Sequence, residues 1–222
     1  MGKLGFGYGS EWHLLRYLGY HRENLSKQVL QLIGGEDIHW LDFKFSKGIN
    51  PTKNDKELVG LEFIEDNKIN QAWQAYWPKS GNSQNWDALG KIHYRNKTEW
   101  LLVEAKAHLG EVKSTCGAQN QKSKNQIARA LENTMDHCGV QQTSLNSWLS
   151  PYYQYANRLA VLNFLMQECD PEIPAHLLYI YFTGDKRSDS AECPQNSMEW
   201  QPVIEEMEKW LGLSDDFVFR NR

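Results

Sequence analysis

Two carboxylates and one lysine could share a chemical site in this chain of 222 residues. Asp87 stands just before one apolar run, and Glu104 and Lys106 end the next apolar run. Facing carboxylates repel each other unless a positive group joins them, and a divalent cation, the lysine or both could do so. Mg²⁺ prefers oxygen ligands, usually one or two of them carboxylates, so this set suits metal-assisted hydrolysis of a phosphodiester.

A β-hairpin would bring the three side chains together. We predict two antiparallel strands joined by a two-residue turn at Arg95 and Asn96. Counting outward from that turn, Asp87 falls directly opposite Glu104, and directly opposed side chains lie on one face of the sheet. Lys106 shares this face, because side chains two residues apart along a strand point the same way.

The short pattern of an acid two residues before a lysine is not specific, because it occurs four times. The other three matches start at Asp42, Asp66 and Glu111. Only Glu104 ends an apolar strand and has a facing acid, so context selects it. Glu111 and His108 lie close enough in the sequence to serve as outer-shell groups.

Composition limits the class of protein. The net charge of -4 excludes a strongly basic protein that coats nucleic acid, although the stretch 113–129 is locally basic. The four cysteines form no CxxC pair, so zinc-ribbon and redox spacings are absent. No apolar run approaches the roughly 20 residues that a membrane span needs, and we predict a cytoplasmic protein.

The whole chain, residues 1–222, is predicted to form a single domain. The fold class is α/β (or α+β), with a mixed sheet flanked by helices and with helical elaborations. The predicted parts are a helical N-terminal part over 10–78, the hairpin core over 85–106, helices over 123–138, 151–168 and 199–211, and a strand over 176–184.

The first predicted helix carries a further acid. Ser10 is the expected N-cap, and Glu11 lies in register with Leu14, Leu15 and Leu18 on one helical stripe. Two interpretations stay open for Glu11: a residue stabilised by the helix dipole, or a carboxylate that points into the site.

Polar side chains on two later helices are candidates for binding nucleic acid. Ser123 and Lys124 open a predicted capping box with a basic first turn. The mostly apolar helix 151–168 carries a second group, Gln154, Asn157 and Arg158. Because that helix is nearly buried, these groups need partners, which internal capping or salt bridges could also supply.

Asp87 followed by Glu104-Ala-Lys106 at the end of an apolar strand resembles the PD-(D/E)XK nuclease superfamily, whose members are similar to restriction endonucleases. The resemblance implies a restriction-endonuclease-like fold and a catalytic set of Glu11, Asp87, Glu104 and Lys106. It also implies that Glu11, Asp87 and Glu104 bind Mg²⁺ or Mn²⁺. Trp86 stands where these nucleases often have proline.

A glutamine on a later helix often belongs to such sites, and Gln154 and Gln126 are both candidates. The resemblance therefore predicts a divalent-metal-dependent nuclease, with DNA preferred to RNA as its substrate. By analogy alone it suggests a homodimer. Two alternatives are kept: a non-catalytic module that binds nucleic acid or protein on the same fold, and an enzyme acting on small molecules. The acids and lysine could also be a structural ion cluster that closes the sheet.

Overall fold

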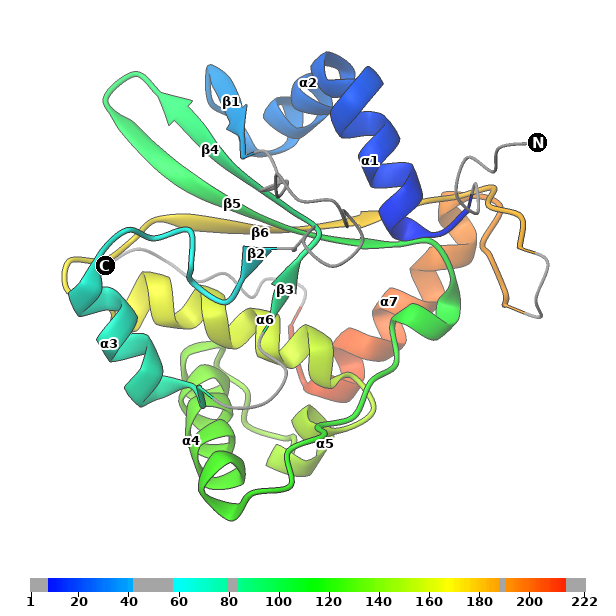
Figure 1. The fold of residues 1–222 in the computed structure, drawn as a ribbon. Coiled ribbons are helices and arrows are strands. Elements are labelled where there is room, and N and C mark those ends of the chain that lie inside the picture. Colours follow the sequence, from blue (N-terminus) through cyan, green and yellow to red (C-terminus); the bar gives the residue numbers. More distant parts are fainter. Residues whose placement is uncertain (1–7, 42–57, 80–83, 188–190, 215–222) are drawn as a thin grey trace, which may run out of the picture.

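The computed structural model describes residues 8–41, 58–79, 84–187 and 191–214. It confirms the mixed α/β class: a four-stranded sheet lies between two groups of helices (Figure 1).

The main sheet has the strand order β1-β4-β5-β6. β1 pairs with β4 and β4 with β5 in antiparallel fashion, whereas β5 and β6 run parallel, so the sheet is mixed. The strands are β1 (Asp37–Trp40), β4 (Ala88–Tyr94), β5 (Lys97–Lys106) and β6 (Ala175–Tyr181). A second, two-stranded sheet joins β2 (Leu58–Val59) to β3 (Asn85–Trp86).

The predicted hairpin and its turn are confirmed. Tyr94 pairs with Lys97 across Arg95 and Asn96, and this register continues to the pair of Ala88 with Val103.

Helices cover both faces of the sheet (Figure 1). α1 (Ser10–Tyr20) and α2 (Arg22–Ile33) lie on one face, and α6 (Tyr153–Asn163) lies against the other. The remaining helices are on the α6 side: α3 (Asn67–Tyr76), α4 (Gln121–His137), α5 (Leu145–Leu149) and α7 (Ser197–Leu211).

The alternation of side chains along β5 decides what faces α6. Leu101, Val103 and Ala105 belong to the core under α1 and α2, whereas Leu102 belongs to the core around α6. Since side chains alternate between the faces, Glu104 and Lys106 must point toward α6.

Several predicted boundaries need correction. The part 10–78 is not purely helical, because β1 joins the main sheet through the buried side chains of Ile38 and Trp40, and β2 follows. Residues 42–57 of this part lie outside the described residues. A short helix, α5, lies between the predicted helices 123–138 and 151–168.

The predicted capping box at Ser123 is wrong. α4 begins at Gln121, and the Asn120 side chain accepts hydrogen bonds from the first backbone N–H groups. Gln126 does not cap α4, because its amide donates to the carbonyl oxygens of Gln74 and Ala75 at the end of α3.

The other boundaries shift by a few residues. The helix predicted over 151–168 begins at Tyr153, and its last turn, Phe164–Glu168, is π-helical. The strand predicted over 176–184 is β6 and ends at Tyr181, and the last helix begins at Ser197 rather than 199. Gly212 ends that helix, with φ 71° in the left-handed region.

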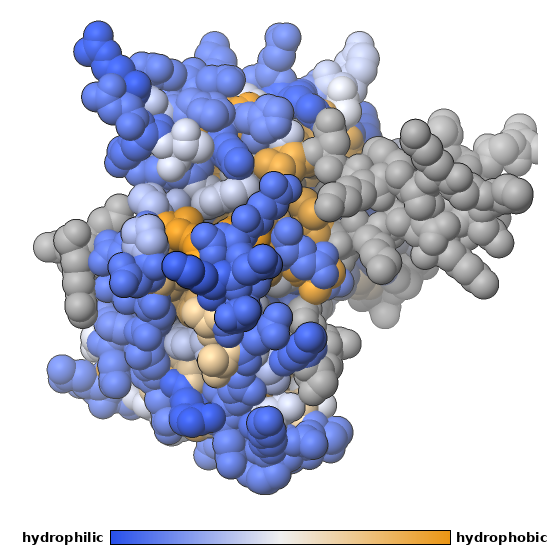
Figure 2. Space-filling view, turned by 60° about the vertical axis from the view of Figure 1, so that its left-hand side comes forward, coloured by the Kyte–Doolittle hydropathy of each residue, from blue (hydrophilic) through white to orange (hydrophobic). Residues whose placement is uncertain are grey.

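Most of the face shown in Figure 2 is hydrophilic, and hydrophobic residues reach the surface there in a narrow central band. No helix in the described ranges has the length and apolar character that crossing a membrane requires.

The end of β5 near the hairpin turn holds an ion cluster around Glu99. This cluster makes the free energy of unfolding depend on pH. Glu99 accepts hydrogen bonds from Lys97 and from His176 on β6. Burial alone would raise the pKa of the Glu99 carboxyl, but these two partners outweigh burial and hold the pKa below its ordinary value of 4.5.

We predict that Glu99→Gln lowers the free energy of unfolding at pH 7 by roughly 1–2 kcal/mol, because charge-assisted hydrogen bonds are lost. Since the folded-state pKa is lowered, the wild-type advantage is present above about pH 4.5 and disappears as pH falls through the folded-state pKa. Urea unfolding between pH 7 and 3 measures this. Glu62→Gln, at an exposed position, is the control. Equal stabilities at pH 7 would contradict the prediction.

Candidate active site at the end of strand β5

Glu104 is the centre of a buried polar network on the α6 face of the sheet. Its carboxylate accepts hydrogen bonds on both oxygens although the residue is only 2% exposed. Oε1 accepts from Lys106 Nζ and, at 2.8 Å, from Gln154 Nε2. Oε2 lies 2.9 Å from both Nε and Nη2 of Arg158. These four contacts match the roughly four lone-pair positions that a carboxylate offers.

Lys106 is buried as well, at 6% exposure, and it lies on the same side as Glu104, as predicted. Its ammonium donates to Glu104 and, at 3.0 Å, to Gln154 Oε1. Gln154 therefore contacts both members of the pair and fixes the direction of the ammonium. Of the two glutamines considered, Gln154 is the one that the structure brings to the site.

Arg158 is anchored by more than its contact with Glu104. Nη2 donates to the carbonyl oxygen of Asn85 at 2.6 Å, and Nη1 donates to Asn157 Oδ1 at 2.8 Å. The guanidinium also lies over the Trp86 ring, 5.0 Å from its centroid. Arg158 thus ties α6 to β3 and β5. Arg158 is 4% exposed, and its contact with nucleic acid stays a prediction.

Asp87 is near the network, but the predicted pairing of Asp87 with Glu104 does not form. Counted from the hairpin turn, the last pair of the antiparallel ladder is Ala88 with Val103, one residue short of Asp87. The chain turns away at Trp86, whose buried indole donates to Gly60 O while β3 pairs with β2. Asp87 Oδ2 instead accepts the backbone N–H of Ala105 at 2.7 Å. The carboxylate therefore sits beside the peptide bond between Glu104 and Ala105, one residue before Lys106.

Glu11 is not part of the buried stripe of α1. Leu14 and Leu18 are buried, whereas Leu15 is 44% exposed and Glu11 is exposed too. The stripe passes through Tyr17, which packs against the same core, so it is rotated from the one predicted. The dipole-stabilised interpretation of Glu11 agrees with this exposure. Its role as a metal ligand stays a prediction.

Other polar groups bring the start of α1 to the sheet edge at which β5 and β6 end. The Gly9 N–H donates to Asp185 Oδ2 at 2.8 Å, and Ser10 Oγ donates to Glu111 Oε1 at 3.0 Å. Ser10 is thus bonded to Glu111 rather than capping α1. His13 Nε2 lies 3.1 Å from Asp185 Oδ1. Burial raises the pKa of Asp185, but hydrogen bonds from Gly9, His13 and Lys186 outweigh burial and hold it below its ordinary value.

Ser123 and Lys124 are not brought to the network. They lie in the first turns of α4, and Figure 1 shows α6 between α4 and the sheet. Lys124 is exposed, and Ser123 is largely buried. Asn157, the remaining residue of the predicted nucleic-acid set, is buried and bonded to Arg158.

Tyrosines on β6 close the network on its other side. The parallel register places Tyr179 beside Glu104 and Tyr181 beside Lys106. The Tyr179 ring stacks on Tyr155 of α6 at 4.8 Å. Burial, with a smaller contribution from the Glu104 charge, raises the pKa of Tyr179 well above its ordinary value. These phenols therefore stay neutral at physiological pH.

The charges of the site balance without an added ion. The two acids, Asp87 and Glu104, carry one negative charge more than Lys106 neutralises. The guanidinium of Arg158 supplies the second positive charge. The oxygen donors of Asp87 and Glu104 are of the kind that Mg²⁺ takes. A cation at Glu104 would however have to replace one of the four present contacts. Within the described residues, no three His, Cys, Asp or Glu side chains form a group that could hold a metal.

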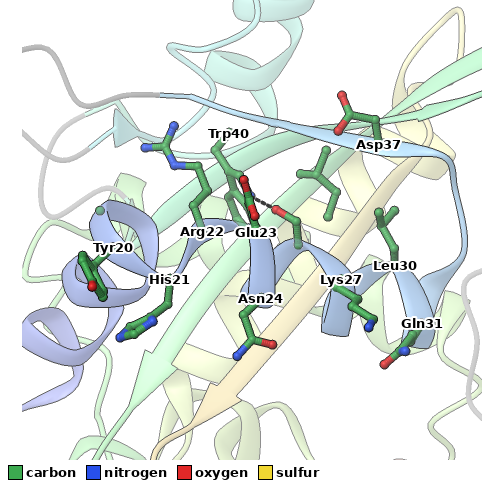
Figure 3. A pocket seen from close by; sticks show the side chains of 13 residues that line it. Tyr20, His21, Arg22, Glu23, Asn24, Lys27, Leu30, Gln31, Asp37 and Trp40 are labelled. Carbon is green, nitrogen blue, oxygen red and sulfur yellow. Dashed lines mark hydrogen bonds between the residues drawn. The ribbon is translucent and has the colours of Figure 1, made fainter.

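An open groove lies elsewhere. A hollow of about 1030 Å³ is formed by α2, the end of α1 and β1, on the face opposite α6 (Figure 3). The charged ends of Arg22, Lys27 and Asp37 point in different directions around it. We therefore place the candidate chemistry at Glu104, where charged groups converge, rather than in this hollow.

Comparison of the chain with protein-family models, with curated proteins and with solved structures gives no match. The interpretation of the candidate site therefore depends on the geometry of its residues.

The buried pair of Glu104 and Arg158 makes a testable energetic prediction. We expect Arg158→Met to lower the free energy of unfolding by about 3–5 kcal/mol, because it leaves a buried carboxylate without its main partner. The double variant Glu104→Gln/Arg158→Met should be more stable than the sum of the single effects, by at least about 1 kcal/mol. Chemical denaturation of the four proteins measures both values.

Arg129→Met is the matched control, because Arg129 is an exposed arginine on α4. It should change the free energy of unfolding by no more than about 0.5 kcal/mol. Additive effects of Glu104→Gln and Arg158→Met would show that the two side chains are not coupled.

Proposed function

We propose that the chain is a divalent-metal-dependent nuclease of the PD-(D/E)XK type that hydrolyses phosphodiester bonds, with DNA as the expected substrate. The observation that carries the proposal is the convergence of Glu104, Lys106 and Gln154, with Asp87 bonded to the backbone N–H group that lies between Glu104 and Lys106. A mixed sheet with a central hairpin and helices on both faces agrees with a restriction-endonuclease-like fold. Pairing into a homodimer stays a prediction.

In this proposal each side chain has a defined task. Asp87 and Glu104 hold Mg²⁺ or Mn²⁺, which supplies Lewis-acid stabilisation of charge on the phosphate. Lys106 directs its ammonium at the attacking water or at a phosphate oxygen, where a positive group stabilises the developing charge. Gln154 holds Lys106 and Glu104 in register through its two amide atoms.

The contact that exchanges at Glu104 is the one with Lys106. Arg158 has further anchors at Asn85, Asn157 and Trp86, which hold it in place. Lys106 has a flexible side chain, and its other acceptor among the described residues is Gln154. Release from Glu104 Oε1 would therefore turn the ammonium toward substrate while Arg158 keeps Oε2 oriented.

We expect the wild-type protein to nick supercoiled plasmid or to cleave a labelled single-stranded oligonucleotide when Mg²⁺ or Mn²⁺ is present, and to stop when EDTA is added. Lys106→Ala should lower the rate by roughly 100-fold or more, because a group that stabilises the transition state is lost. Lys97→Ala is the control: Lys97 also pairs with a glutamate two residues away on β5, at the opposite end of the strand.

The control should retain the wild-type rate within about twofold. A wild-type rate no higher than that of Lys106→Ala on both substrates would overturn catalysis at this site.

The saturation of Glu104 by three hydrogen bonds and one further ion-pair contact favours a second candidate, a non-catalytic module that binds nucleic acid or protein on the same fold. The two candidates differ in their use of a divalent cation. For a nuclease, Mg²⁺ should tighten DNA binding by the cleavage-deficient Lys106→Ala protein at least about threefold, and Glu104→Gln should remove this gain. Fluorescence anisotropy at constant ionic strength measures it. DNA binding unaffected by Mg²⁺ would support the module instead.

A further inference from the structure

β5 extends beyond its antiparallel partner, β4. β4 begins only at Ala88, which pairs with Val103, so among the described residues no strand of the sheet pairs with the N–H groups of Ala105 and Ala107 on that side. Both residues are fully buried. A buried N–H group without an acceptor is costly, so each requires a partner.

Carboxylates supply both partners. Asp87 Oδ2 accepts the N–H of Ala105 at 2.7 Å, and Glu111 Oε2 accepts the N–H of Ala107 at 2.6 Å. These are the backbone groups on either side of Lys106. On the other edge of the strand, the Phe182 N–H donates to the Lys106 carbonyl at 2.7 Å. The backbone that carries the ammonium is therefore held on both edges.

Glu111 reaches back because the chain turns sharply after β5. Residues Leu109–Glu111 form one turn of 3-10 helix, and this turn directs the carboxylate to the N–H groups of Ala107 and, at 3.3 Å, His108. The second oxygen of Glu111 accepts the Ser10 hydroxyl at 3.0 Å. One carboxylate thus joins the end of β5 to the start of α1.

We propose that Glu111 is a positioning residue for Lys106, an inference that rests on the proposed nuclease function. Glu111 acts through the peptide at Ala107 and fixes the direction in which the Lys106 side chain leaves the strand. A misplacement of about 1 Å at a reacting group can cost 100-fold in rate, so the loss of this bond affects turnover. In this role both Glu111 oxygens are used within the protein, by Ser10 and by the backbone after Lys106, so the loss should fall on turnover rather than on substrate binding.

The experiment measures kcat and KM on a labelled DNA oligonucleotide with Mg²⁺. Glu111→Ala should lower kcat roughly 10- to 100-fold with KM unchanged within about twofold. Glu111→Gln keeps an oxygen that can accept the Ala107 N–H, and it should recover at least about a third of the wild-type kcat. Glu111→Asp is too short to reach Ala107, and it replaces Glu111→Ala if that variant fails to fold.

Asp66→Ala is the matched control. Asp66 also accepts two backbone N–H groups, from Lys68 and Ile69, but at the start of α3. It should lower thermal stability by a similar amount and leave kcat at the wild-type value.

The outcomes separate the two proposals. A wild-type rate no higher than that of Lys106→Ala overturns the nuclease function and this inference with it. A wild-type rate that exceeds that of Lys106→Ala, together with an unchanged kcat in Glu111→Ala or Glu111→Asp, overturns only the role of Glu111. Equal losses of kcat in Asp66→Ala and Glu111→Ala would reduce Glu111 to a stabilising residue and overturn its role as well.

Discussion

The buried charge of Glu104 is the constraint on which the arrangement around the sheet depends. A carboxylate that loses its water costs several kcal/mol unless positive groups and hydrogen bonds replace that water. One cation comes from its own strand, at Lys106, and the other from α6, at Arg158. Because the guanidinium must reach Glu104 while also bonding to Asn85, α6 can pack against β5 in few orientations. The charge of Glu104 therefore restricts the orientation of α6 as well as the side chains that surround the carboxylate.

The same constraint explains why a mostly apolar helix carries polar residues. Gln154, Asn157 and Arg158 are spaced by three and four positions, so they lie on one face of α6. Gln154 and Arg158 bond to Glu104, and Asn157 orients the guanidinium. Their need for partners follows from burial, which the apolar surroundings predict. Which partner each one takes depends on how α6 crosses β5, and no local pattern in the sequence contains that crossing.

Local patterns predicted the hairpin well, and the predictions failed where distant contacts decide. Alternation and a short polar break were sufficient to place Ala88 opposite Val103. The predicted position of Asp87, one residue beyond Ala88, was wrong. Trp86 donates a hydrogen bond to Gly60, 26 positions earlier in the sequence, and this contact turns the chain away from the ladder. On α1, Leu14, Leu15 and Leu18 look equally apolar, so counting leucines cannot show that Leu15 and Glu11 face away from the core. Glu111 was noticed for its position near Lys106, but its bond to Ala107 depends on the turn after β5.

Charge balance also bears on how the proposed site would work. Asp87 and Glu104 are offset by Lys106 and Arg158, so the described arrangement is formally neutral. A divalent cation added to it would leave two buried positive charges in excess, which low-dielectric surroundings oppose. An anionic phosphodiester that arrives with the cation removes part of that excess. The proposed nuclease would therefore bind cation and nucleic acid together, each favouring the other, and stay closed around Glu104 in the absence of both. A neutral cluster in which Lys106 never leaves Glu104 needs neither the cation nor the nucleic acid. Release of Lys106 from Glu104 therefore distinguishes an enzyme from a structural ion cluster.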